Sequence, residues 1–262
     1  MSEQYAGAIL DLDGTVYRGE HAVDGAVTGI ERLRAAGVDL VFLTNNPIER
    51  RSSYRDRLAA IGVDADLESV LTAATISATY LANTHPDEAT FVVGETPLVE
   101  ELETAGVTTT TDPSRAEVVL ASMDRTFEYA DLEDVLDAFE NEPAFYATNP
   151  DRTCPVADGE IPDAAAMIGA IEGLTGQELD GVIGKPSATA VTVAAEQLGV
   201  DPMQCLVVGD RLETDITMGQ RAGMDTALVL SGVTDRNQLD GSTADPSYVL
   251  ESLGDIEAVL ES

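Results

Sequence analysis

Two carboxylates lie two positions apart, directly after a short apolar run. Asp11 and Asp13 follow Ala8-Ile9-Leu10, and Gly14 comes next. Two buried carboxylates this close repel each other unless a counter-charge lies between them. A hard divalent cation such as Mg²⁺ supplies that charge, because it prefers carboxylate, phosphate and water oxygens. One carboxylate can then act as a nucleophile and the other as an acid and base.

Two further segments could bind a phosphate group. Thr44 and Asn45 follow an apolar run, and they can donate hydrogen bonds to a phosphoryl oxygen without adding charge. Lys185 precedes Pro186 and Ser187, which open a predicted helix. The lysine ammonium and the positive end of that helix both favour an anion. These residues therefore predict a phosphate site.

A fourth segment adds more carboxylates. Asp210 follows the apolar run Cys205–Val208 and Gly209, and Asp215 lies five positions further on. Asp210 is a natural third oxygen ligand for the metal, and Asp215 could act directly or through water. The segment is not a dinucleotide fingerprint, because it has no G-x-G-x-x-G pattern.

Short β-rich apolar runs alternate with amphipathic helical stretches along the chain, a pattern typical of α/β architecture with a largely parallel sheet. In such sheets, functional residues gather beyond the carboxyl ends of the strands. The first predicted set of strands comprises Ala6–Leu12, Val38–Leu43, Glu68–Leu71, Gly181–Ile183, Cys205–Val208 and Thr226–Leu230, with helices Val23–Ala36, Arg51–Ile61, Ala188–Leu198 and Glu213–Ala222. The middle of the chain predicts a second α/β module, with strands Thr90–Val93, Glu117–Ser122 and Ala144–Ala147 and helices Thr72–Ala82, Pro97–Ala105, Leu132–Phe139 and Pro162–Leu174.

The charge of the chain is strongly one-sided. It has 48 acidic and 14 basic residues and a net charge of −34. This field repels nucleic acid and anionic membranes, so neither is an expected partner. At about 1 M salt the screening length falls to roughly 3 Å, and the self-repulsion nearly vanishes. We therefore expect a halophilic host with a salty cytoplasm. Lys185 is the one lysine of the chain, which favours a functional role for it.

The composition predicts a folded protein of the cytoplasm. Its 262 residues are 44% hydrophobic, which is enough for a substantial core. No apolar run reaches the roughly 18 residues that span a bilayer, and the first residues lack a signal-peptide pattern. Cys154 and Cys205 have no metal-site spacing and are expected to be ordinary thiols.

The four motifs in their order resemble those of the haloacid dehalogenase superfamily of aspartate-nucleophile phosphatases. They read DLDGT, TNN, GKPS and GDRLETDI. The chain is most similar to the NagD-like branch, related to p-nitrophenyl phosphatases, which also favours DxDGTxYxG and a TNPD segment, here Thr148–Asp151. Pro47 departs from the serine that many relatives have after TNN. The resemblance implies a Rossmann-like, doubly wound parallel-sheet core with an inserted, smaller α/β cap domain.

The position of the cap follows from the spacing of the motifs. The segment between Asp13 and Thr44 is too short for a domain, whereas the segment between Thr44 and Lys185 is long enough. We therefore expect a cap over residues 73–181 and a catalytic core over 1–72 and 182–262, as in the class IIA branch. Relatives with the cap after the first motif fit poorly.

The resemblance also implies roles for the carboxylates. Asp11 attacks phosphorus and forms an aspartyl-phosphate, and Asp13 protonates the leaving oxygen and then deprotonates water. Mg²⁺ is held by the Asp11 carboxylate, the Asp13 main-chain carbonyl and Asp210. Asp215 lies behind these ligands.

The remaining expectations concern the substrate and partners. Thr44, Asn45 and Lys185 position the phosphoryl oxygens of a small phosphorylated metabolite: a sugar, polyol or nucleoside monophosphate. Arg125 and Arg152 are candidates to contact a second anionic group. Relatives often pair through their caps, so a homodimer or a larger homo-oligomer is open. Two other functions also use such residues: a dehalogenase, and a receiver-like phospho-acceptor with an Asp-Thr-Lys site.

Overall fold

The computed structural model describes residues 5–156 and 159–261. The chain divides into two compact units. The first unit comprises Met1–Thr44, Arg51–Leu71 and Pro186–Ser262, and the second comprises Asn45–Arg50 and Thr72–Lys185. The chain thus leaves the first unit after Leu71 and returns at Pro186, and the short segment Asn45–Arg50 also packs with the second unit.

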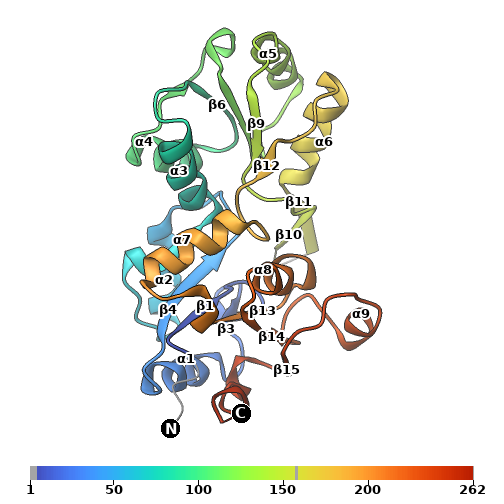
Figure 1. Ribbon diagram of the computed structural model, residues 1–262. Helices are drawn as coiled ribbons and strands as arrows, with labels where there is room; N and C mark the ends of the chain where they lie inside the picture. Colours follow the sequence, from blue (N-terminus) through green and yellow to red (C-terminus); the bar gives the residue numbers. More distant parts are fainter. Residues whose placement is uncertain (1–4, 157–158, 262) are drawn as a thin grey trace. The chain divides into compact units, whose positions relative to one another are not determined.

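A six-stranded sheet forms the centre of the first unit, in the order β15-β14-β13-β1-β4-β5. Strand β1 pairs in parallel with β13 on one side and with β4 on the other. The chain therefore winds away from β1 in both directions, which makes the carboxyl end of β1 a topological switch point (Figure 1). The strands are β1 Gly7–Leu10, β4 Asp39–Thr44, β5 Val70–Thr72, β13 Cys205–Gly209, β14 Asp225–Val229 and β15 Tyr248–Leu250, with a small hairpin of β2 Tyr17–Arg18 and β3 His21–Ala22.

Both faces of this sheet are buried, as in most parallel sheets. Alternate residues of β1 face opposite sides, so Ala8 and Leu10 join one apolar cluster while Ile9 points the other way. Helix α1 contributes Ile30 and Leu33 to that cluster. The helices of the unit are α1 Ala26–Ala35, α2 Arg51–Ala60, α7 Ala188–Leu198, α8 Thr217–Arg221, α9 Arg236–Asp240 and α10 Glu257–Leu260.

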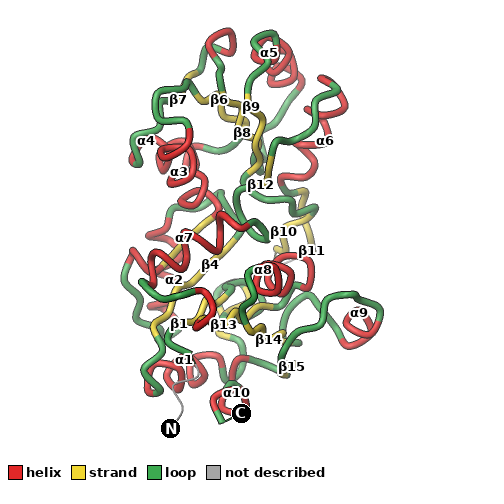
Figure 2. The backbone as a smooth tube through the Cα atoms, viewed as in Figure 1, coloured by secondary structure: helices red, strands yellow, loops and turns green. Residues whose placement is uncertain are grey.

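The second unit is built on its own parallel sheet, in the order β12-β9-β8-β6-β7. Phe91, Val119 and Phe145 from this sheet pack with Val135 of α5 and Ile168 of α6. Figure 2 shows the strands of this sheet between helices. The elements are β6 Thr90–Val93, β7 Thr109–Thr110, β8 Val118–Ala121, β9 Ala144–Ala147, β10 Thr153–Val156, β11 Gly159–Pro162, β12 Gly181–Val182, α3 Ala73–Thr84, α4 Thr96–Thr104, α5 Tyr129–Phe139 and α6 Ala164–Thr175.

Helix ends follow the capping residues in the sequence. The side chain of Ser187 accepts a hydrogen bond from the N–H of Ala190 and starts α7, and Gly199 ends it at φ 66°. Helix α3 starts with a capping box, in which Thr72 and Thr75 each bond the other's backbone N–H. Ser187 and Gly199 explain why helix α7 has the bounds predicted from the sequence.

The structure corrects one assignment of the sequence. The sequence pattern predicts Gly181–Ile183 as a strand of the first set, but β12 pairs with β9 in the sheet of the second unit. The run is too short and too polar to reveal its partner. The antiparallel hairpin of β10 and β11 was not predicted either, because Pro155 and Pro162 weaken a strand pattern. Among the described residues, no helix is both long and apolar enough to cross a membrane.

The closest packing of helix α1 predicts a large effect at Gly29. A methyl group there would overlap the carbonyl oxygen of Leu253, whereas one at Gly173 of α6 would meet nothing within 4 Å. We expect Gly29→Ala to lower the free energy of unfolding by about 1–3 kcal/mol through overpacking. Gly173→Ala, the control, should raise it by about 0.5–1 kcal/mol, because alanine favours helix. Denaturant unfolding measures both, and equal effects would contradict the packing.

Candidate active site

Asp11 lies at the switch point of the first unit's sheet. It directly follows β1, and its backbone N–H donates to the carbonyl oxygen of Val208 in the neighbouring strand, at 2.9 Å. This bond fixes the backbone where the strand ends. The side chain is 8% exposed. A carboxylate is therefore held at the place where parallel α/β sheets carry their reactive groups.

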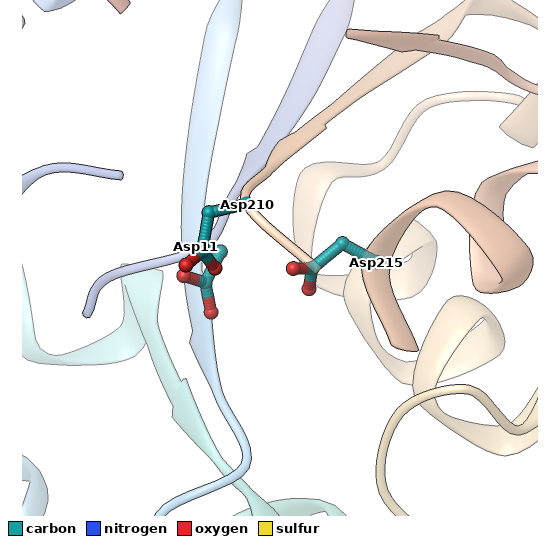
Figure 3. Close-up of side chains that lie close together, drawn as sticks. All are labelled: Asp11, Asp210 and Asp215. Atoms are coloured by element: carbon teal, nitrogen blue, oxygen red, sulfur yellow. The ribbon is translucent and has the colours of Figure 1, made fainter. Parts of the chain in front are cut away.

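Two more carboxylates lie beside it. Asp210 follows β13, and Asp215 belongs to the single π-helical turn Leu212–Ile216 that comes next. Asp11, Asp210 and Asp215 each offer an oxygen within 4.8 Å of the others, and all three side chains are buried. Figure 3 shows that Asp11 and Asp210 lie together and that Asp215 points toward them from the helical turn. The sequence predicts that these three carboxylates lie close together, and the structure places them close together.

Three buried negative charges this close strongly favour a bound cation. Burial removes most of the water that would otherwise screen their mutual repulsion. An all-oxygen set of carboxylates suits a hard divalent ion such as Mg²⁺. The residues present therefore fit a hard divalent metal ion.

Glycines make room for these carboxylates. An added Cβ at Gly14 would lie 2.5 Å from Asp210 Oδ2, and one at Gly232 would overlap the same side chain. An added Cβ at Gly209 would overlap Asp215. Any side chain at these positions would push a carboxylate out of the group. The glycine of DLDGT and the glycine before Asp210 are thus required by space.

Backbone donors orient the same carboxylates. The N–H of Val233 donates to Asp210 Oδ2 at 2.6 Å, and the N–H of Arg211 donates to Asp215 Oδ2 at 3.0 Å. The N–H of Thr234 also donates to the carbonyl oxygen of Asp210, at 3.2 Å. Hydrogen bonds to ionised carboxylates are short and strong, so these carboxylates are held in place before any ligand arrives.

Asp13 lies in a tight turn beside this group. The N–H of Gly14 donates to the carbonyl oxygen of Tyr17 at 2.8 Å, and Gly14 has φ 91°, which favours glycine. Among the described residues, the group of three close carboxylates does not include Asp13. Its predicted ligand is the main-chain carbonyl, and that assignment stays a prediction.

Tyr17 anchors the turn. Its ring is fully buried, and the guanidinium of Arg57 lies over it at 5.3 Å. Burial raises the pKa of Tyr17 well above its usual value, and the negative charge of Asp13 adds to this. The buried phenol is therefore fixed beside the turn that follows Asp13.

The predicted phosphate-binding residues fall in two places. Thr44 is the last residue of β4 in the first unit and is buried. Asn45 and Lys185 belong to the second unit, where they contact each other. The backbone N–H of Lys185 donates to Asn45 Oδ1 at 2.9 Å, and Asn45 Nδ2 donates to the carbonyl oxygen of Lys185 at 3.0 Å. The Lys185 side chain is 3% exposed.

Other candidate groups have local partners. Arg125 donates to both carboxylate oxygens of Glu95, at 2.6 and 2.7 Å. These hydrogen bonds lower the pKa of Glu95 and raise that of Arg125. Arg152 is exposed. Burial raises the pKa of Cys205 to about 11, so this thiol is unreactive at neutral pH, as expected from the sequence.

Comparison with known proteins now identifies the class. Residues 8–108 match a family model of haloacid dehalogenase-like hydrolases, and residues 182–256 match a second model of the same kind. Sugar-phosphatase AraL of Bacillus subtilis is 36% identical, over 98% of this chain and 93% of that protein.

Solved structures agree. A p-nitrophenyl phosphatase from Archaeoglobus fulgidus has a TM-score of 0.91 and 33% identity, covering 97% of this chain and 99% of that one. NagD from E. coli K-12 has a TM-score of 0.87 and 30% identity, covering 96% and 98%. The chain belongs to the haloacid dehalogenase-like hydrolases, in the branch of phosphoric monoester hydrolases that includes NagD. The predicted family, α/β fold and enzyme class are confirmed.

The crowding at Gly232 generates a test of the carboxylate group. We expect Gly232→Ala to displace Asp210 and to weaken Mg²⁺ binding by about tenfold or more, which corresponds to roughly 1.4 kcal/mol. Gly241→Ala is the control, because its nearest atom would lie 3.7 Å away. Isothermal titration calorimetry measures the affinity of each folded variant. Equal affinity of the two variants would contradict the proposed ligand group.

Proposed function

We propose that the protein hydrolyses small phosphate monoesters through an aspartyl-phosphate formed on Asp11, with Mg²⁺ as cofactor. The observation that carries the proposal is the buried group of Asp11, Asp210 and Asp215 at the switch point of the sheet. A cation held there beside the Asp11 carboxylate can bind the anionic oxygens of a phosphate ester and bring its phosphorus within reach of Asp11.

The first half of the reaction uses two carboxylates. One Asp11 oxygen attacks phosphorus in line, the bond to the ester oxygen breaks, and Asp13 gives its proton to the departing alcohol. Asp11, Asp210 and the Asp13 carbonyl would hold the Mg²⁺, with Asp215 behind them. When bound, the cation offsets the repulsion between the anionic nucleophile and the anionic substrate.

The second half regenerates the enzyme. Asp13, now ionised, takes a proton from a water molecule, whose oxygen attacks the phosphorus of the aspartyl-phosphate. The bond from phosphorus to Asp11 breaks, and inorganic phosphate leaves. In both steps, Thr44 donates a hydrogen bond to a phosphoryl oxygen, and the Lys185 ammonium stabilises the negative charge of the phosphoryl group. A chain of net charge −34 needs such a local positive group to attract an anion.

We propose sugar phosphates as the first substrates to test, because the relative AraL is named a sugar-phosphatase. Polyol phosphates and nucleoside monophosphates follow. The second unit is proposed to act as a cap that closes over the substrate and excludes bulk water. We further propose a cytoplasmic enzyme, working in high salt and forming a homo-oligomer through this unit. Activity assays therefore belong in molar KCl as well as in dilute buffer.

The nucleophile is tested by Asp11→Asn. An amide cannot attack phosphorus, so we expect phosphatase activity to fall to background while the far-ultraviolet circular dichroism stays unchanged. Asp39→Asn is the matched control, since Asp39 is exposed at the opposite end of the adjacent strand β4. Steady-state hydrolysis of p-nitrophenyl phosphate measures both. More than a few per cent of wild-type activity in Asp11→Asn, with contamination excluded, would refute the assignment.

The lysine is tested by Lys185→Met. A positioned charge in a partly dry site is worth roughly 2.7–4 kcal/mol, so we expect kcat/KM to fall by about 10² to 10³. The fall should be similar for three unlike phosphate esters, because the lysine contacts their common group. Lys185→Arg should not restore activity fully, because a planar fork does not replace a compact ammonium.

The control for the lysine is Arg115→Met, which removes the same charge from an exposed 3₁₀ turn of the second unit. A fall confined to one ester would move Lys185 from phosphate binding to substrate specificity. An unchanged kcat/KM for all three esters would end its role in catalysis.

A further inference from the structure

The carboxamide of Asn45 forms a clamp on the backbone of Lys185. Its oxygen accepts from the Lys185 N–H at 2.9 Å, and its nitrogen donates to the Lys185 carbonyl at 3.0 Å. The carboxamide thus pairs with both the N–H and the carbonyl of Lys185, as a residue of a neighbouring antiparallel strand would. Both bonds are buried, so each is protected from competing water. The clamp fixes the backbone from which the lysine side chain departs.

An amide can bind in two orientations, and only one of them fits Lys185. If the carboxamide turned over, its nitrogen would face the Lys185 N–H and its oxygen would face the Lys185 carbonyl. Both hydrogen bonds would then become repulsive contacts. The backbone of Lys185 therefore favours one orientation of the carboxamide, and a further partner of Asn45 can strengthen that preference.

Asp151 is such a partner and favours the same orientation. Asn45 Nδ2 donates its other hydrogen to Asp151 Oδ2, at 2.9 Å. An ionised carboxylate can only accept hydrogen bonds, so it rejects the amide oxygen and attracts the amide nitrogen. The carboxylate therefore holds the nitrogen of Asn45 on the side that leaves its oxygen facing the Lys185 N–H.

Asp151 is itself fixed by a second amide. Asn149 is fully buried, and its Nδ2 donates to the same oxygen, Asp151 Oδ2, at 3.2 Å and to Asp163 Oδ1 at 3.0 Å. Asp163 caps α6 by accepting from the N–H of Ala164. The series of hydrogen bonds thus runs from a helix start, through Asn149 and Asp151, to the clamp on Lys185.

Close packing at Gly184 restricts movement of the backbone next to Lys185. The N–H of Gly184 donates to the carbonyl oxygen of Thr148 at 2.8 Å. An added Cβ at Gly184 would overlap that oxygen and lie 2.9 Å from Asn45 Oδ1. The backbone at Gly184 therefore packs closely against both Thr148 and the carboxamide of Asn45.

We infer that Asp151 is a positioning residue for Lys185, acting through the carboxamide of Asn45. The inference rests on the proposed role of Lys185 in phosphate binding. It also assigns the Asn45 side chain to holding Lys185. A contact of Asn45 with a phosphoryl oxygen stays a prediction.

The single lysine makes a direct measurement feasible. Protein labelled with ¹⁵N-lysine has one labelled backbone amide, that of Lys185, whose hydrogen exchange reports on its bond to Asn45. In Asp151→Ala we expect this exchange to accelerate about tenfold or more, and kcat/KM to fall about tenfold, as for a loss of roughly 1.4 kcal/mol. Asp151→Asn keeps an acceptor oxygen and should restore both values to within about threefold of wild type.

A matched control separates positioning from general stability. Asp180 accepts a hydrogen bond from the N–H of Phe145 at 2.7 Å in the same unit, at the other end of strand β9. Asp180→Ala should change neither the Lys185 exchange rate nor kcat/KM, even where it lowers the melting temperature. If Asp151→Ala does not fold, Asn45→Ala replaces it, since it removes the middle link of the same series.

The outcomes keep the inference distinct from the proposed function. Unchanged exchange of the Lys185 amide in a folded Asp151→Ala or Asn45→Ala variant overturns the inference. Equal acceleration in Asp180→Ala also overturns it, because the effect would then be general loosening. Faster exchange with an unchanged kcat/KM upholds the hydrogen-bond link to Lys185 but overturns Asp151 as a positioning residue for the reaction, whereas Lys185→Met alone decides the role of the lysine. In a Lys185→Met background, Asp151→Ala should cost less than about twofold further.

Discussion

The mutual repulsion of three buried carboxylates is the constraint around which the first unit is organised. Asp11, Asp210 and Asp215 offer oxygens within 4.8 Å of one another and are buried. Such an arrangement is costly for the apo protein. Its cost falls when a divalent cation binds, so the group is suited to hold a metal ion.

The surrounding structure keeps these carboxylates from moving apart. Glycines leave space on one side, and backbone N–H groups at Arg211 and Val233 hold the outer oxygens. Rigid parallel strands carry Asp11 and Asp210 to the same edge of the sheet. In the second unit, the backbone of Lys185 is held in a similar way by the carboxamide of Asn45, which in turn donates to the carboxylate of Asp151. The carboxylates of the first unit and the backbone that carries Lys185 are thus both held by hydrogen bonds before any ligand binds.

Sequence reasoning could find the groups that carry chemistry, because each stands at the end of an apolar run. Asp11 and Asp210 follow strands whose apolar patterns are plain, so their meeting follows from the parallel topology. Sequence reasoning could not find the hydrogen bonds and close contacts that hold these groups in place. The bond from Asp151 to Asn45 joins residues 106 positions apart, and nothing local marks Asp151 as its partner. Gly232 likewise matters only through the side chain that it faces. Short strands such as β12 were misplaced for the same reason, since pairing partners depend on tertiary packing.

The proposed reaction depends on covalent phosphorylation of Asp11, and chemical trapping of the aspartyl-phosphate detects that step. Enzyme mixed with substrate and Mg²⁺ is quenched within milliseconds and treated with borohydride, which reduces an acyl phosphate to an alcohol. Mass spectrometry of the peptide that contains residue 11 then reads the result. We predict conversion of Asp11 to homoserine, dependent on substrate, with Asp13 and Asp210 unchanged. Full turnover with no modified aspartate, or with modification at another carboxylate, would contradict the account.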